Sequence, residues 1–312
     1  MRVLFMGTPD FALEVLKAVY AKDGVDVIGA VTQTDKPKGR GMKMIAPPVK
    51  VFAEEHDIPV FQPTTLKDGA FENELKSLDP ELIVVAAYGK ILPHYVIAYP
   101  KYGCVNAHAS LLPRWRGAAP INRAIMAGDT VTGVTAMYMD DGLDTGDAIL
   151  KVEVPIGDDD NVGTVHDKLA EAGGRAICEV IDMIASGSVP RAPQSSDGVT
   201  YAEKITKEDC RLDFSLPCRE VYNKIRALAP TPCAVTTTAD GHLLKITGAR
   251  MTDKVANALP GTVISTDGGM IEVALQDGTI QIDGVIPEGK SRMSAADYIR
   301  GRKVSVCDVL GK

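Results

Sequence analysis

Three polar residues, Asn106, His108 and Asp144, have side chains that can stabilise an oxyanion and move protons. The apolar pair Cys104-Val105 precedes Asn106 and indicates the end of a buried strand. Because side chains alternate along a strand, Asn106 and His108 are expected on the same side. Asp144 belongs to an acidic turn at residues 141–147. Active sites of open α/β sheets lie beyond the carboxyl ends of their strands, so we expect the chemistry at this point.

The segment after His108, Ser110-Leu111-Leu112-Pro113, is too apolar for a solvated loop and ends in a rigid residue. We expect it to line a groove for a flat ligand. Simpler interpretations remain open, since Asn106 and His108 can form a polar strand end and Asp144 can belong to a plain turn. The acidic turn lacks the residue order of an EF-hand, so calcium is not expected.

A basic segment at residues 35–50 stands out from an acidic chain whose formal net charge is −7. Its cationic residues are Lys36, Lys38, Arg40, Lys43 and Lys50, and they are interrupted by glycine and proline. Glycine and proline favour an exposed, mobile loop. Such a loop suits a polyanion, although an inert solvated loop is the alternative. Contact with nucleic acid must be local, because overall basicity is absent.

The composition is that of an ordinary soluble protein, with 312 residues of which 45% are hydrophobic. No run approaches the roughly 18 apolar residues of a membrane span, so we expect a cytoplasmic protein without membrane contact. We also expect it to act as a monomer. The six cysteines are scattered, with no Cys-x-x-Cys pair and no zinc spacing. They are expected to be free thiols that fill the core, and no metal site is predicted.

Strands are predicted to alternate with helices, which implies a parallel α/β sheet with right-handed crossovers. The expected strands are residues 3–7, 25–31, 82–87, 104–106, 134–139 and 148–154, and the expected helices begin at Phe11 and cover 49–55 and 162–185. Gly173-Gly174 should weaken the last helix locally. The turn at residues 7–11 lacks Gly-x-Gly-x-x-Gly, so a nicotinamide dinucleotide is not indicated.

Two domains are predicted, a catalytic domain at 1–186 and a C-terminal domain at 207–312, joined by a polar, proline-bearing linker at 187–206. The C-terminal domain should contain one helix near residues 218–229 and a small antiparallel barrel. Its expected turns are the Asp-Gly steps at 240–241, 267–269, 277–278 and 283–284.

With these residues in view, the chain resembles the methionyl-tRNA formyltransferases, a family of folate-dependent formyltransferases, over essentially its full length. The motifs that carry the resemblance are Gly7-Thr8-Pro9-Asp10-Phe11, Gly39-Arg40-Gly41, Tyr88-Gly89, Asn106-x-His108-x-Ser110-Leu111-Leu112-Pro113 and Gly142-Leu143-Asp144-Thr145-Gly146. The chain departs from the family pattern at Ala109, Met42 and Thr231. These departures bear on tRNA binding more than on chemistry.

The resemblance implies a Rossmann-like catalytic domain followed by an OB-like β-barrel that binds tRNA. It implies that Asn106, His108 and Asp144 are the catalytic trio, and that Ser110, Leu111, Leu112 and Pro113 contact the donor 10-formyltetrahydrofolate. It further implies that Lys36, Lys38, Arg40 and Lys43 lie on a loop that enters the acceptor arm of initiator tRNA.

The hypothesis that follows is transfer of the formyl group to the α-amino group of methionyl-initiator tRNA, giving N-formylmethionyl-tRNA for translation initiation. Asn106 and His108 would donate hydrogen bonds to the developing oxyanion, and Asp144 would orient the imidazole. One alternative is another enzyme that uses the same donor, with a small amine or water as acceptor. A second alternative is a non-catalytic protein that binds tRNA or folate.

Overall fold

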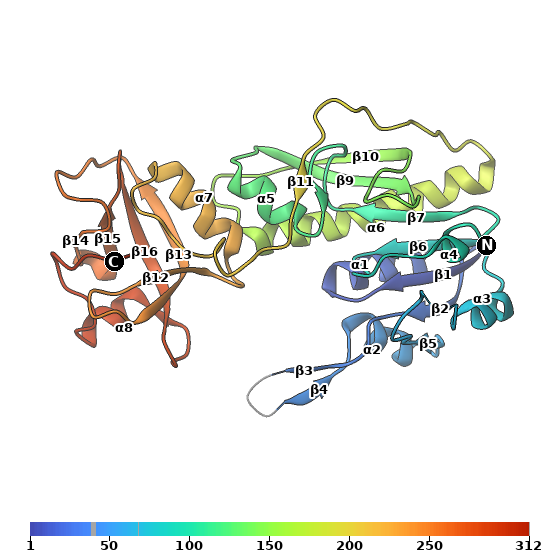
Figure 1. Cartoon of the computed structure of the whole chain (residues 1–312), viewed down its shortest axis with the longest axis horizontal. Helices are drawn as coiled ribbons and strands as arrows, with labels where there is room; N and C mark the ends of the chain where they lie inside the picture. The colour runs from blue at the N-terminus through green and yellow to red at the C-terminus, as the bar shows by residue number, and fades with distance from the viewer. Residues whose placement is uncertain (39–41, 68, 312) are drawn as a thin grey trace. The chain divides into compact units, whose positions relative to one another are not determined.

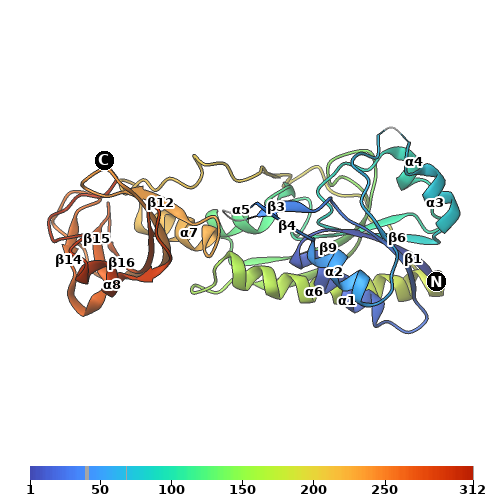
Figure 2. The ribbon, with the colours of Figure 1, turned by 90° about the horizontal axis from the view of Figure 1, so that it is seen from below.

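The computed structural model describes residues 1–38, 42–67 and 69–311, shown in two views in Figures 1 and 2. The chain divides into two compact units. Unit 1 comprises Met1–Pro120, Val131–Pro155 and His166–Glu203, whereas unit 2 comprises Ile121–Thr130, Ile156–Val165 and the C-terminal segment from Lys204. Much of the expected linker thus groups with unit 1, and two short internal segments group with unit 2.

Unit 1 is built on a seven-stranded sheet of order β10-β9-β7-β6-β1-β2-β5. Its five parallel strands are β1 (Arg2–Gly7), β2 (Asp26–Val31), β5 (Val60–Phe61), β6 (Leu82–Ala86) and β7 (Cys104–His108). β9 (Val131–Tyr138) and β10 (Ala148–Pro155) add an antiparallel edge. The predicted parallel α/β sheet is confirmed, with this hairpin as its one antiparallel part among the described strands.

Helices cover both faces of the sheet (Figure 2). α1 (Asp10–Tyr20) and α6 (Val162–Ser186) lie on one face, and α3 (Glu72–Leu78) and α4 (His94–Ile97) lie on the other. α2 (Pro48–Glu55) packs beside α1. Strands buried on both faces consist almost entirely of apolar residues, as the sequence of β1 shows at Val3–Met6.

The glycine pair in α6 does not interrupt the helix, which is continuous from Val162 to Ser186. A Cβ atom added at Gly174 would lie 2.8 Å from Ala18 Cβ of α1. The glycines therefore allow α1 to approach α6 closely, and tertiary packing overrides the low helix propensity that made a local weakness expected.

Unit 2 contains a six-stranded antiparallel sheet that forms a half-barrel, with order β12-β13-β16-β15-β14 and β17 paired to β16. Its elements are α7 (Cys218–Leu228), β12 (Ala234–Thr237), β13 (Leu243–Thr252), β14 (Val263–Ser265), β15 (Ile271–Ala274), β16 (Thr279–Pro287), β17 (Met293–Ser294) and α8 (Ala295–Arg300). Apolar residues of α7 at positions 218, 221, 225 and 228 join the core of the sheet. This spacing is the reason why the sequence predicted the helix.

Three of the four expected Asp-Gly turns connect consecutive elements of the half-barrel, but the fourth prediction is wrong. Asp283-Gly284 lies inside β16, where the register with β13 shifts around Gly248. A Cβ atom at Gly248 would lie 2.3 Å from the Asp283 carboxylate. The dipeptide therefore marks a β-bulge in a long strand, for which glycine is as suitable as it is for a turn.

The basic segment, expected as a loop, contains a short antiparallel pair, β3 (Lys36–Lys38) and β4 (Lys43–Ile45). Among the residues described in the fold, a second small pair joins β8 (Arg116–Gly117) to β11 (Tyr201–Ala202). This second pair brings the segment after residue 187 against the loop that follows β7. α5 (Pro120–Met126) comes after β8 along the chain.

Candidate active site

Asn106 and His108 lie at the carboxyl end of β7, between parallel β6 and antiparallel β9. Ala107 faces α6, because a Cβ atom at Gly173 of that helix would lie 3.9 Å from its Cβ. Alternation then directs Asn106 and His108 to the opposite face of the sheet. Both side chains are buried. The sequence pattern predicted this shared face and its position at a strand end.

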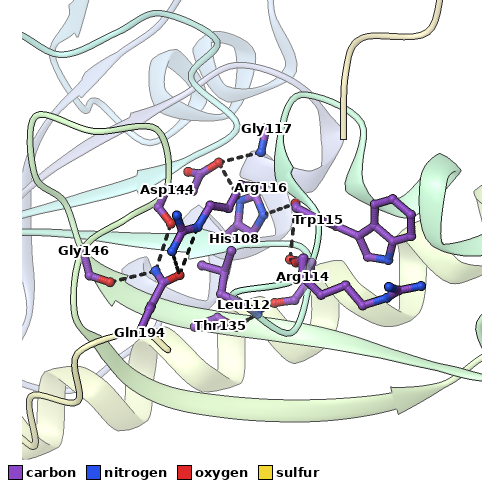
Figure 3. A network of polar contacts seen from close by, with 11 residues as sticks. His108, Leu112, Arg114, Trp115, Arg116, Gly117, Thr135, Asp144, Gly146 and Gln194 are labelled. Carbon is purple, nitrogen blue, oxygen red and sulfur yellow. Dashed lines mark hydrogen bonds and ion pairs between the residues drawn. The ribbon is translucent and has the colours of Figure 1, made fainter. Parts of the chain in front are cut away.

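The His108 ring contacts two acceptors of its own chain. Nε2 lies 2.9 Å from the backbone oxygen of Trp115, a hydrogen bond in which the ring nitrogen is the donor (Figure 3). Nδ1 lies 3.6 Å from Asp144 Oδ2, which is ion-pair range but longer than a hydrogen bond. In the neutral ring, donation from Nε2 leaves Nδ1 with the lone pair, directed toward the Asp144 side.

The Asp144 carboxylate bonds to a residue outside the turn at 141–147, although Asp144 itself belongs to that turn. Its Oδ2 accepts the backbone N–H of Gly117 at 2.8 Å. Asp140, not Asp144, holds the turn itself, because its Oδ1 accepts from Gly142 N at 3.0 Å and from Thr145 Oγ1 at 2.7 Å. The two aspartates thus differ in their surroundings although the sequence presents them alike.

Asn106 differs from His108 in its hydrogen bonds. Within the part of the chain that the structure describes, no hydrogen bond involves the Asn106 carboxamide, whereas the His108 ring contacts Trp115 and Asp144. A primary amide has two donor hydrogens and one acceptor oxygen. Asn106 therefore retains its hydrogen-bonding capacity for a bound molecule.

The loop after His108 is a compact structure held from within. Ser110 Oγ donates to Arg114 O at 2.7 Å, and both Ser110 and Leu112 are buried. Thr135 of β9 fastens the loop to the sheet, since its Oγ1 donates to Ser110 O at 2.7 Å and accepts from Leu112 N at 3.0 Å. Lys151 Nζ donates to Leu112 O. Of the four residues predicted to contact a ligand, Ser110 and Leu112 therefore have structural contacts.

The other two, Leu111 and Pro113, are partly exposed. Leu111 lies over β9 at Gly133, where an added Cβ atom would be 2.5 Å from Leu111 Cδ2 and 2.2 Å from Val152 O. Glycine at position 133 thus makes room for the loop. The backbone and the partly exposed side chains at 111 and 113 are the surfaces this loop can present to a donor.

Three of the predicted tRNA-binding residues, Lys36, Lys38 and Lys43, lie on the β3–β4 pair, away from β7 in the sequence but in the same unit. Lys36 and Lys43 are exposed, and Lys36 Nζ donates to Gln33 Oε1 at 2.6 Å. Lys38 ends β3, and Arg40 lies outside the described residues. The base of the pair is anchored by Asp35, whose pKa is lowered by hydrogen bonds from Gln62 and Lys50.

Three residues near the trio were not predicted from the sequence: Thr135, Arg116 and Gln194. Thr135 is a β-branched strand residue and Arg116 is the second of two arginines in Arg114-Trp115-Arg116, so neither has a distinguishing pattern. Gln194 lies in the segment predicted as a linker, where proline and serine indicate loop chemistry alone. Their roles depend on contacts between distant parts of the chain, which no local spacing reveals.

Cys104 of β7 is poorly suited to act as a nucleophile, because its side chain is buried. Burial raises the pKa of the Cys104 thiol to about 12, and its Sγ donates to Val96 O at 3.5 Å. All six cysteines are free, and four of the others are partly or fully buried. Among the described residues, no group of three or more His, Cys, Asp and Glu side chains is arranged to hold a metal ion. No described helix is long and apolar enough to span a membrane.

Comparison with known proteins decides the family. Residues 1–181 match the model of the formyl transferase family, and residues 204–303 match the model of the formyl transferase C-terminal domain. The chain belongs to the formyl transferase family. Together the two models cover most of this formyl transferase, and the first contains Asn106, His108 and Asp144.

Curated relatives share its full length. The methionyl-tRNA formyltransferase of Bacillus velezensis is 46% identical over 312 residues, which is 100% of this chain and 98% of that protein. The methionyl-tRNA formyltransferase of Geotalea uraniireducens is 44% identical with the same coverage, 100% of this chain and 98% of that protein. The resemblance inferred from the motifs is confirmed.

Solved structures share the fold at low identity. HypX from Aquifex aeolicus in complex with tetrahydrofolic acid has a TM-score of 0.67 and 16% identity, over 98% of this chain and 48% of that chain. An N-formyltransferase from Helicobacter canadensis, in complex with folinic acid and dTDP-3-aminofucose, has a TM-score of 0.65 and 18% identity, over 90% of this chain and 98% of that chain. The predicted fold class, a Rossmann-like parallel-sheet domain followed by a small OB-like barrel, is confirmed, and the structure forms the second domain as an antiparallel half-barrel.

Proposed function

We propose that this formyl transferase transfers the formyl group of 10-formyltetrahydrofolate to the α-amino group of methionyl-initiator tRNA. The product, N-formylmethionyl-tRNA, starts translation in organisms that use it. Full-length relatives named methionyl-tRNA formyltransferase support the acceptor and the reaction. The observation that carries the chemistry is that His108 Nδ1 lies 3.6 Å from Asp144 Oδ2. Asn106 lies on the same face of β7, at its carboxyl end.

Asn106 is the group we assign to the formyl oxygen. Its carboxamide has no partner among the described residues, and its N–H can donate to an oxygen that gains negative charge as the amine attacks. A preorganised donor of this kind contributes roughly 10²–10³ in rate. Burial in β7 holds the donor in place, which is what preorganisation requires.

His108 is assigned to the proton that the attacking amine must lose. As the bond from the α-amino nitrogen to the formyl carbon forms, the bond from that carbon to folate N10 breaks, and tetrahydrofolate leaves with a proton on N10. The Trp115 carbonyl engages Nε2–H, so the lone pair of the neutral ring is on Nδ1, the nitrogen that faces Asp144. Proton uptake at Nδ1 then produces an imidazolium beside a carboxylate, which stabilises it. This refines the sequence-based hypothesis, in which the imidazole donated to the oxyanion, because that nitrogen already has the Trp115 oxygen as its acceptor.

Donor binding is assigned to the loop at 110–113, through its backbone and through the partly exposed Leu111 and Pro113. Ser110 and Leu112 act by holding the loop in shape. The tRNA is assigned to the β3–β4 pair with Lys36, Lys38, Arg40 and Lys43, and to unit 2. We propose the catalytic domain at 1–186, the linker at 187–206 and the tRNA-binding domain at 207–312 as functional divisions of a cytoplasmic monomer.

The reaction is tested by following labelled formyl from 10-formyltetrahydrofolate with four acceptors in competition: methionyl-initiator tRNA, free methionine, glycinamide ribonucleotide and water. We expect label in the charged tRNA alone. Release of labelled formate would identify a hydrolase, and label in a small amine would identify a different formyltransferase. Intact tRNA and folate binding without any turnover would identify a binding protein, and each of these results would reject the proposal.

A further inference from the structure

Gln194 connects the loop after β7 to the turn that contains Asp144 (Figure 3). Its Nε2 donates to the backbone oxygens of Asp144 at 2.9 Å and Gly146 at 2.8 Å. Its Oε1 accepts from Arg116, from Nε at 3.2 Å and from Nη2 at 2.7 Å. Arg116 is buried and Gln194 is partly buried, so solvent reaches this contact only in part. One carboxamide therefore joins the loop after β7 to the turn between β9 and β10.

The contact pattern suits a carboxamide and few other groups. The side chain must donate twice at one end and accept twice at the other, which is the full capacity of glutamine. Glutamate could accept from Arg116, but it would place a charge against two carbonyl oxygens. Lysine or arginine could donate to the carbonyls, but neither could accept from Arg116.

The turn that Gln194 holds needs external support. Asp144 has φ of 53°, in the left-handed region, which costs a residue that is not glycine. Its carboxylate meets the Gly117 N–H at 2.8 Å and the His108 ring at 3.6 Å. Residues 116 and 117 thus hold Asp144 twice, once directly through the N–H of Gly117 and once through Gln194.

We propose that Gln194 is a positioning residue for formyl transfer, which holds the Asp144 carboxylate against His108 by bonding both carbonyls of the turn. This inference rests on the proposed function for its kinetic consequence. The contacts alone determine its structural consequence, namely that loss of the Gln194 amide displaces the Asp144 carboxylate from Gly117 N.

The first experiment compares Gln194→Ala and Gln194→Glu with Ser195→Ala. Ser195 is the matched control, because its Oγ accepts from Asp197 N in the same segment and has no other hydrogen bond to the described residues. We expect kcat to fall about 10- to 100-fold in both Gln194 variants, with KM for the tRNA within about twofold, as for residues that orient a catalytic group. Full activity in Gln194→Glu would show that Gln194 serves only to accept from Arg116, and would overturn the proposal.

A double-mutant cycle separates positioning from general support. If Gln194 acts through Asp144, then Gln194→Ala lowers kcat little further in an Asp144→Asn background. If the two losses multiply, Gln194 acts independently of Asp144 and the proposal fails. A residue that only stabilises the fold would give multiplied losses, so this readout distinguishes the two roles.

The backbone amide of Gly117 provides a readout without any formyl transfer. Its N–H bonds to the carboxylate of Asp144, so its proton NMR signal should move on Asp144→Asn. We expect both Gln194 variants to move the signal in the same direction, and Ser195→Ala to leave it in place. An unmoved signal in the Gln194 variants would overturn the positioning role. If the wild-type chain did not formylate the tRNA, the proposed function would fail and this signal alone would decide the positioning role.

Discussion

His108 Nε2 lies 2.9 Å from the backbone oxygen of Trp115, and this bond determines which ring nitrogen faces Asp144. A main-chain carbonyl cannot titrate, so this hydrogen bond holds the ring independently of the contact with Asp144. The loop at 110–115 therefore does more than border a ligand site. Its internal bonds place the Trp115 carbonyl, and through that carbonyl they place the imidazole.

Removal of the Asn106 carboxamide tests the oxyanion donor. We expect Asn106→Ala to lower turnover at least about a hundredfold, because the developing oxyanion loses a preorganised donor. The affinity for charged tRNA should change little. Rapid-quench kinetics under single turnover, with a filter-binding measurement of tRNA affinity, checks both expectations. A loss that appeared in tRNA affinity alone would contradict the assignment.

The hydroxyl of Thr135 tests how the loop is held. Thr135→Val keeps the shape of the side chain but leaves Ser110 O and Leu112 N without this partner. We expect the free energy of unfolding to fall by about 1–3 kcal/mol and donor affinity to decrease. Thr132→Val is the matched control on the same strand, because Thr132 Oγ1 is buried without a hydrogen-bond partner in the described structure. Its stability should be unchanged or higher, and equal losses in the two variants would reject the role of Thr135.

The lysines of the β3–β4 pair test the tRNA contact. We expect Lys43→Ala to weaken tRNA binding and to reduce the slope of log affinity against log salt by about 1, as for one phosphate contact. Donor binding should be unchanged. Lys76→Ala is the control, since Lys76 is an exposed lysine paired with Glu72 on α3. An affinity that does not depend on salt would remove the pair from the tRNA site. The same test applies to Arg40.

Asp209 gives a prediction for stability against pH. Hydrogen bonds from Arg123 and from the Thr206 backbone lower its pKa to about 2, below the value near 3.9 of the unfolded chain. The carboxylate therefore stabilises the fold fully above pH 4, and this contribution is lost as the pH falls from about 4 to 2. Asp209→Asn should cost about 1–2 kcal/mol at pH 7, after allowance for solvent screening.

Denaturant unfolding of the wild type and Asp209→Asn between pH 7 and pH 3 checks this prediction. The difference in free energy of unfolding between the two proteins should be constant down to about pH 4 and should decrease below it. Asp213→Asn is a useful comparison, because among the described residues the Asp213 carboxylate accepts only from Ser215, and its pKa is also lowered. If the loss of unfolding free energy in Asp209→Asn did not change at low pH, the charge of the Asp209 carboxylate would not be the source of its stabilising effect.

Strand and helix patterns were sufficient to predict the parallel sheet and the shared face of Asn106 and His108, because both follow from local periodicity. The bulge at Asp283 was mispredicted as a turn, and the packing role of Gly174 was not foreseen, since aspartate-glycine and glycine pairs have several structural uses. Gln194 and Thr135 could not be identified at all. Their contacts join segments more than 20 residues apart, and no spacing in the sequence encodes them.

The most direct test of catalysis by this site is the single-turnover rate of formyl transfer to methionyl-initiator tRNA in His108→Ala, with donor and enzyme in excess. We predict a rate at least about a hundredfold below the wild type, with tRNA affinity within about threefold. A near-normal rate in the folded variant would contradict the assignment of proton transfer to His108, and the catalytic trio would have to be placed elsewhere.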